Sequence, residues 1–170
     1  MVKSNYMKLT KLQLENFRNH SQYSYEFDID KDLTILVGPN GIGKTNFLEA
    51  IYVLALGKSF RISSQEEMIK WENDYLRCSS EIFSGNEKID LEVFYSQRPR
   101  NQKSFKKNGV KMKNSEYLGN LLAVLFHPED LNMLYLGPDL RRRYLDILNL
   151  QINKDYYRAL RSYKQIVKQR

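Results

Sequence analysis

One segment of the sequence combines glycines, a lysine and a hydroxyl residue at a spacing suited to binding phosphate. Residues Gly38, Pro39, Asn40, Gly41, Ile42, Gly43, Lys44 and Thr45 fit the pattern G-x-x-x-x-G-K-[ST] at every position. Glycines let successive backbone N–H groups curl around phosphate oxygens, and a following helix adds the positive end of its dipole. The lysine of such a loop reaches the β- and γ-phosphates, and the hydroxyl binds Mg²⁺. We therefore predict that residues 38–45 bind a nucleoside triphosphate and that Thr45 is a ligand of Mg²⁺.

The residues on either side of this loop predict the strand and the helix that must position it. The segment Leu33–Val37 is almost entirely apolar, as in a strand buried on both faces, and it leads directly into the loop. From Asn46 to Leu56 the apolar spacing predicts a helix with one broad buried face, and Gly57 is a natural helix stop. A buried strand before the loop and an amphipathic helix after it are the context that a phosphate loop requires.

Other parts of the chain alternate between apolar and polar residues, which is typical of strands. Predicted strands cover Lys8–Leu14, Tyr23–Phe27, Leu76–Phe83, Ile89–Tyr95, Lys103–Lys107 and Val110–Met112, with a further buried strand at Leu121–Phe126. The dipeptide Asn108-Gly109 is a strong hairpin signal. Pro128 and Pro138 each indicate a helix start, and the apolar spacing from Tyr156 to Val167 predicts a final helix. The chain therefore belongs to the α/β class.

Hydrolysis of ATP needs a carboxylate that follows an apolar strand, and the sequence offers one weak candidate. The strand Leu121–Phe126 is separated from Glu129 and Asp130 by His127 and Pro128. Proline at this place favours the start of a helix over the Mg²⁺-binding acid of a Walker B element. We expect the hydrolytic machinery to be absent from this chain, whether or not it binds ATP.

The net charge of +7 is concentrated in one short window. Seven basic residues and no acidic ones lie between positions 98 and 113, and the rest of the chain carries 20 of each sign. Within the predicted hairpin we assign Lys103, Lys106, Lys107 and Lys111 to nucleic-acid phosphates. A solvated, lysine-rich hairpin without a partner remains the alternative.

Composition also excludes several classes of protein. A single cysteine, Cys78, excludes a disulfide framework and a cysteine-based zinc site, and the two histidines, His20 and His127, lie far apart. No apolar run approaches the roughly 20 residues that cross a bilayer. The polar first residues lack the apolar centre of a signal peptide. We expect a cytoplasmic protein without a membrane partner.

Several motifs resemble one family, the RecF proteins among the SMC-like, ABC-type ATPase heads. The matching segments run in order along the chain at residues 12–19, 38–52, 54–61, 124–131 and 137–146. They include Asn16-Phe17-Arg18-Asn19, the phosphate loop, and Gly57-Lys58-Ser59-Phe60-Arg61. Their order from position 12 to position 146 makes a chance match difficult to obtain.

This resemblance implies a fold, ligands and partners. The fold would be the first lobe of an ABC-type ATPase head, with a mixed sheet around the phosphate-loop helix and an antiparallel β subdomain, over residues 1–138. Residues 139–170 would begin a helical second lobe, and we expect the chain to be truncated there because its last predicted helix has no stop signal. Arg18 and Asn19 would lie on the adenine side of bound ATP, and a loop at Pro128–Asp130 would face the γ-phosphate.

The function implied is that of an ATP-dependent DNA-binding protein of recombinational repair and replication-gap processing. Such a protein recognises single-stranded DNA or single-strand/double-strand junctions, dimerises with ATP, helps to load recombinase, works with other recombination mediators, and hydrolyses ATP slowly. Two alternatives stay open. The chain could be a P-loop phosphotransferase with Arg141–Arg143 as its only candidate lid, or a structural fragment that binds ATP merely as a folding ligand.

Overall fold

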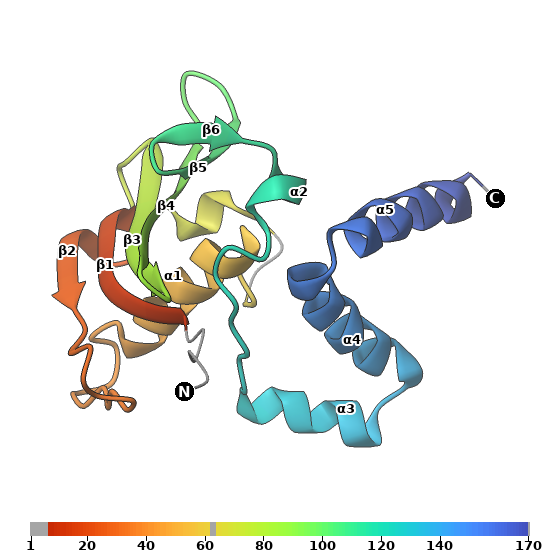
Figure 1. Cartoon of the computed structure of the whole chain (residues 1–170), viewed down its shortest axis with the longest axis horizontal. Coiled ribbons are helices and arrows are strands. Elements are labelled where there is room, and N and C mark those ends of the chain that lie inside the picture. Colours follow the sequence, from red (N-terminus) through yellow and green to blue (C-terminus); the bar gives the residue numbers. More distant parts are fainter. Residues whose placement is uncertain (1–6, 62–63, 170) are drawn as a thin grey trace.

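The computed structural model describes residues 7–61 and 64–169, which form one antiparallel sheet, a helix packed on it, and a group of helices at one end. The elements in chain order are β1 (Met7–Phe17), β2 (His20–Glu26), α1 (Lys44–Leu56), η1 (Glu66–Met68), β3 (Tyr75–Ser84), β4 (Glu87–Ser96), β5 (Gln102–Lys107), β6 (Val110–Met112), α2 (Asn114–Tyr117), η2 (Pro128–Leu131), α3 (Asn132–Tyr135), α4 (Pro138–Ile152) and α5 (Lys154–Lys168). Figure 1 shows α3, α4 and α5 at the end of the molecule opposite the edge strand β2.

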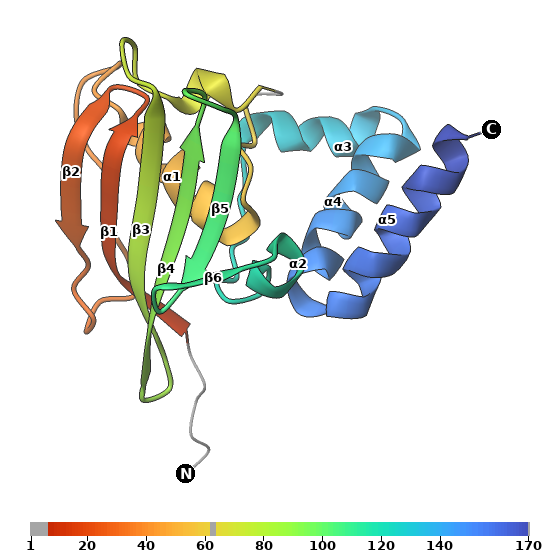
Figure 2. The same cartoon turned by 90° about the horizontal axis from the view of Figure 1, so that it is seen from above.

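The six strands pair in the order β2-β1-β3-β4-β5-β6, and every pair is antiparallel. Alternation decides which side chains face the core, because successive residues of a strand point to opposite faces. In β3, for example, Leu76, Cys78, Ser80 and Ile82 are buried, while Arg77, Ser79 and Glu81 between them are partly exposed. Figure 2 shows the strands side by side, with α1 lying across one face of the sheet.

Helix α1 closes the core because one side of it is apolar. Ala50, Val53 and Leu54 are fully buried and belong to the same cluster as the inward residues of β1, β3 and β4. The helix ends as predicted at Gly57, whose φ of 68° is a left-handed conformation that glycine adopts without strain. A Cβ on Gly57 would lie 2.7 Å from the Phe105 ring, so this glycine also allows β5 to approach the end of α1.

Most predicted elements are confirmed. All four hairpin strands between positions 75 and 112 form, and the turn at Asn108 and Gly109 has φ values of 50° and 77°, as the tight two-residue hairpin turn requires. Pro128 begins η2 and Pro138 begins α4, so the acids near Pro128 follow a helix start rather than a strand end. The helix expected over Tyr156–Val167 is α5.

Two predictions of buried strands are wrong. Residues 33–37 and 121–126 form no strand, and alternate apolar residues in each are exposed: Leu33, Ile35 and Val37 in the first, and Leu122, Val124 and Phe126 in the second. The intervening Leu36, Ala123 and Leu125 do pack against the core. Each segment therefore buries one face only. A strand needs a hydrogen-bonded neighbour, and neither segment pairs with another part of the described chain. The mixed part of the expected sheet, which depended on these segments, is accordingly not seen among the described strands.

Candidate functional site

The phosphate loop turns sharply into α1 because its glycines adopt backbone conformations that other residues avoid. Gly41 and Gly43 have φ values of 83° and 111°, and Gly43 is the residue that precedes the helix. A Cβ on Gly43 would lie 2.7 Å from Nε2 of His20 and 2.9 Å from Oδ1 of Asn19. The loop is thus pressed against the turn between β1 and β2, and only glycine fits at this contact.

Lys44 and Thr45, the residues predicted to bind phosphate and metal, lie in the first turn of α1. The Lys44 Nζ donates hydrogen bonds to the carbonyl oxygens of Gly38 and Pro39, at 2.7 and 2.8 Å. The ammonium therefore lies across the loop and would exchange these carbonyls for phosphate oxygens when a nucleotide binds. The Thr45 side chain is exposed and lines a cavity of about 620 Å³.

This cavity lies between α1 and the helical end of the chain. Its lining includes Thr45 and Tyr52 of α1, Asp130 of η2 and Arg143 of α4. Burial raises the pKa of the Tyr52 hydroxyl, an effect that the nearby positive charge of Arg143 partly offsets. The segment at Pro128–Asp130, expected to face the γ-phosphate, thus has Asp130 on the same cavity as Thr45.

Asp130 is already used in its own turn. Its Oδ2 accepts a hydrogen bond from the backbone N–H of His127 at 2.7 Å, and its own N–H donates to the His127 carbonyl at 2.8 Å. These reciprocal bonds begin η2, as in a helix cap. The carboxylate is therefore a capping group, and the expectation that this chain lacks a Walker B acid stays a prediction. Among the described residues, no group of three or more His, Cys, Asp or Glu side chains is arranged to hold a metal ion.

The donor set fits a nucleoside triphosphate with Mg²⁺. In such a complex the backbone of residues 38 and 40–44 would supply the N–H groups for phosphate, Lys44 would supply a positive charge, and the Thr45 hydroxyl would supply one oxygen ligand for the metal. When bound, Mg²⁺ would neutralise phosphate charge at Thr45.

Arg18 and Asn19 form the β1–β2 turn and lie beside the phosphate loop, but their side chains bind protein groups. The Arg18 guanidinium donates from Nε and Nη2 to the Glu49 carboxylate, at 3.0 and 2.7 Å, and from Nη1 to the Glu67 carbonyl at 2.7 Å. Asn19 donates from Nδ2 to the Ile42 carbonyl at 3.1 Å. An adenine-side role for the two residues stays a prediction, while their contacts show that they hold the loop and its surroundings.

Sequence reasoning missed Glu49 and His20. The Glu49 side chain is fully buried within α1, although acidic residues are almost never buried without a partner. A signal was present, because Glu49 lies three and four residues before the buried Tyr52 and Val53 and thus on the apolar side of the predicted helix. His20, whose Nε2 is buried and makes no hydrogen bond within the described chain, contacts the loop at Gly43; no sequence signal distinguishes it.

The four lysines assigned to nucleic acid differ in their surroundings. Lys103 donates to the Gly57 carbonyl at the end of α1 and lies 5.5 Å from the Phe105 ring centre, and burial lowers its pKa to about 8. Lys106 forms an ion pair of 2.7 Å with Glu92. Lys107 is half-buried on β5, and Lys111 is exposed on β6. The hairpin thus turns two of its four lysines toward protein groups, and binding of DNA by any of them stays a prediction.

Comparisons with known proteins place this geometry in context. The family described as "AAA ATPase domain" matches residues 7–133. The "DNA replication and repair protein RecF" of Staphylococcus epidermidis is 39% identical over 165 residues, and that of Bacillus mycoides is 38% identical over 164. Each match covers 96% of this chain and 43% of the relative, so the chain spans less than half the length of these curated relatives.

Solved structures agree with the sequence comparison. The structure described as "recombination mediator protein RecF-ATP in RecFOR pathway" matches with a TM-score of 0.86 and 34% identity, over 95% of this chain and 43% of that one. An SMC ATPase structure, from work on ATP-driven dimerization, matches with a TM-score of 0.65 and 21% identity, over 82% of this chain and 98% of that one. The first confirms the expected resemblance to RecF, and both confirm the α/β ATPase-head fold. No helix among the described residues is long and apolar enough to cross a membrane.

Proposed function

This chain belongs to the AAA ATPase domain family, and from that membership we propose that it binds ATP with Mg²⁺ as part of a DNA-repair protein. The observation that carries the proposal is the phosphate loop itself. Gly41 and Gly43 have positive φ values, Lys44 spans the loop, and Thr45, the second residue of α1, lines the wall of a cavity. A relative whose structure is described with ATP supports the same ligand.

The whole protein would act in recombinational DNA repair and in processing replication gaps in the cytoplasm. It would bind single-stranded DNA or a single-strand/double-strand junction, dimerise when ATP is bound, and help to load recombinase together with other recombination mediators. The similarity to RecF sequences supports this role, and the basic window between positions 98 and 113 supports DNA as the partner. Lys111, exposed on the edge strand β6, is the lysine best placed for a phosphate.

Catalysis by this chain alone would be absent. Thr45 can hold Mg²⁺ from one side, but the Asp130 carboxylate caps η2. The sequence offers no apolar strand that ends directly in an acidic residue. Without a carboxylate that orients water and a donor for the charge that develops on phosphate, the largest contribution to catalysis is missing. The chain would therefore bind ATP without turnover.

Titration of a fluorescent ATP analogue in Mg²⁺ buffer tests the nucleotide site, with Lys44→Ala as the comparison. Loss of the charged contacts, worth about 1.5–3 kcal/mol, should weaken binding about ten- to a hundredfold while circular dichroism stays unchanged. Equal affinity in the two proteins would refute the site. Phosphate release measured in parallel, with and without DNA, should not exceed the background of Lys44→Ala. Release that depends on Lys44 would show that an acid of this chain, Asp130 first, supports hydrolysis.

A further inference from the structure

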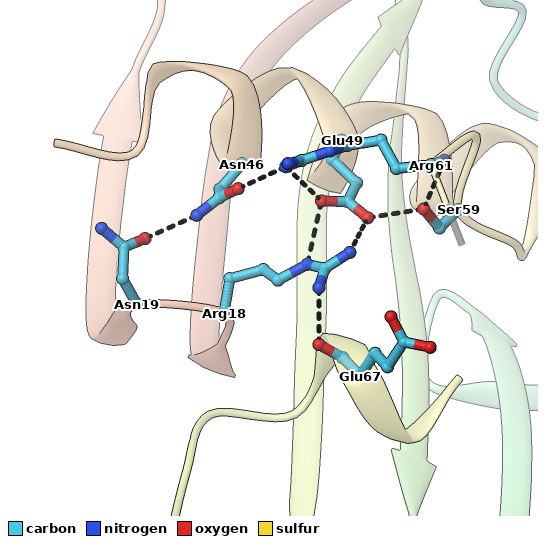
Figure 3. Close-up of polar contacts among 7 residues, drawn as sticks. All are labelled: Arg18, Asn19, Asn46, Glu49, Ser59, Arg61 and Glu67. Carbon is cyan, nitrogen blue, oxygen red and sulfur yellow. Dashed lines mark hydrogen bonds and ion pairs between the residues drawn. The ribbon is translucent and has the colours of Figure 1, made fainter. Parts of the chain in front are cut away.

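A buried carboxylate connects the phosphate loop to the turn beside it. Glu49 lies on α1, five residues after Lys44, and its side chain is fully buried. Figure 3 shows three residues converging on it: Arg18, with bonds of 3.0 and 2.7 Å, Ser59, whose hydroxyl donates at 2.5 Å, and Arg61, whose Nη1 lies 3.5 Å away. Ionised side chains are buried only when paired and hydrogen-bonded, and this carboxylate has both kinds of partner.

The two arginines are not held equally. Arg18 makes both short bonds to Glu49 and keeps only 17% of its side chain exposed. Arg61 is 43% exposed, makes only the long contact to Glu49, and also donates to Oδ1 of Asn46 at 2.9 Å. Two parallel bonds fix the plane of a guanidinium as well as its position. Glu49 therefore fixes Arg18 in orientation and holds Arg61 only loosely.

The fixed arginine belongs to a turn whose backbone needs support. Arg18 has a φ of 55°, a left-handed conformation that residues other than glycine adopt rarely. Its backbone N–H donates to the Met68 carbonyl at 2.8 Å, and its Nη1 donates to the Glu67 carbonyl at 2.7 Å. The guanidinium thus ties the turn to α1 on one side and to η1 on the other.

The next residue of the turn contacts the phosphate loop directly. Asn19 donates from Nδ2 to the carbonyl of Ile42. Ile42 lies between Gly41 and Gly43, both of which have positive φ values. Its Oδ1 accepts from Nδ2 of Asn46 at 2.9 Å and would be only 2.9 Å from a Cβ on Gly43. The first residue of this turn, Arg18, therefore binds Glu49, and the second, Asn19, binds the phosphate loop.

We propose that Glu49 is a positioning residue of the phosphate loop: it orients Arg18, and the turn held in this way presents Asn19 to the Ile42 carbonyl. The loop is then kept in one shape before nucleotide arrives, so that less ordering remains to be done on binding. This inference rests on the proposed binding of ATP. It assigns to Glu49 an effect on nucleotide affinity although its carboxylate lies inside the protein, away from the loop.

The first test compares Glu49→Gln with the wild-type chain in the titration of the fluorescent ATP analogue. Glutamine has the same shape but leaves the Arg18 charge without a counter-ion. Loss of one hydrogen bond to the loop should weaken ATP binding about three- to tenfold. Glu67→Gln is the matched control, because it removes a nearby negative charge and keeps the backbone carbonyl that Arg18 uses. It should bind ATP like the wild type. All titrations are made at a temperature at which circular dichroism shows each variant to be folded.

A double-mutant cycle distinguishes positioning from a merely structural role. Asn19→Ala alone should weaken binding by a similar factor, and adding Glu49→Gln to it should cause little further loss, because both changes remove the same contact. Losses that multiply, or an unchanged affinity in either single variant, would overturn the inference. If Glu49→Gln does not fold, Arg18→Lys takes its place in the cycle, since lysine keeps the charge but cannot make paired bonds.

The result for the wild-type chain separates this inference from the function on which it rests. If the wild-type chain binds ATP and the variants match it, only the role of Glu49 is refuted. If the wild-type chain does not bind ATP at all, the proposed function fails, and the inference fails with it.

Discussion

Lys103 is half-buried against the end of α1, and its replacement by methionine tests whether the ammonium stabilises or destabilises the fold there. Its position in the basic window suggested a DNA contact, whereas the structure places its ammonium on the Gly57 carbonyl at the end of α1. A positive charge is favourable at a helix C-terminus, but burial is costly to an ammonium. The pKa of Lys103 is lowered to about 8, first because the group is buried and second because Lys58 is near.

The lowered pKa makes the stability of the protein depend on pH in a definite direction. The unfolded chain holds this proton up to the ordinary pKa of 10.5, whereas the folded chain releases it near pH 8. Between these values the unfolded state binds more protons, so the free energy of unfolding rises with pH. The lowering of the Lys103 pKa from 10.5 to about 8 corresponds to at most about 3 kcal/mol. Below pH 8 the whole of this amount reduces the free energy of unfolding.

We expect Lys103→Met to be more stable than the wild type at pH 7. The removed cost of about 3 kcal/mol is offset by loss of the bond to Gly57, about 1 kcal/mol, and of the charge at the helix end, about 0.5 kcal/mol. The remainder, about 1–2 kcal/mol, corresponds to an increase in Tm of roughly 3–6 °C for a chain of this size.

Thermal and urea unfolding followed by circular dichroism from pH 7 to pH 10 measure both effects. The difference between variant and wild type should shrink as pH rises, because the wild-type lysine becomes neutral. Lys111→Met, an exposed change in the same hairpin, is the control and should leave stability nearly unchanged at every pH. A Lys103→Met protein that is less stable than wild type at pH 7, with the same pH dependence, would refute the reasoning. It would mean that the cap at Gly57 outweighs the burial of the charge.

Three further predictions concern the loop, the hairpin and the core. Gly43→Ala should abolish ATP binding in the same titration, because its Cβ would meet His20 and Asn19 at a φ of 111°; Gly109→Ala, with open space around it, is the control, and retained affinity would contradict the contact. The double change Lys107→Gln and Lys111→Gln should reduce the magnitude of the salt slope of DNA binding by up to about 2, because each phosphate contact contributes about 0.9. Lys103→Gln should leave the slope unchanged. A larger reduction from Lys103→Gln would show that Lys103 binds DNA phosphate. Cys78 should react with a thiol reagent only on unfolding, because burial raises the pKa of its thiol, and rapid labelling of the folded chain would show that the sheet opens locally.

The sequence determined the local structure and the chemistry of the loop. One short segment, residues 38–56, contains the glycines that permit left-handed backbone, the lysine, the hydroxyl residue and the apolar helix. This segment therefore identified the site without tertiary information. The hairpins were equally local, because alternation and the Asn108-Gly109 turn fix which residues pair. The resemblance to RecF likewise rested on motifs in a fixed order.

Tertiary structure decided what depends on a neighbour. The segments at 33–37 and 121–126 have the composition of strands, but a strand forms only beside a partner, and composition cannot show whether one is present. Lys103 and Lys111 look alike in the sequence, yet one caps α1 and the other is exposed, because only pairing of β4 with β5 brings Lys103 near Gly57. Glu49 is the clearest case. Its partners, Arg18 and Ser59, lie 31 and 10 residues away, so its role exists only once the sheet has brought the β1–β2 turn against α1.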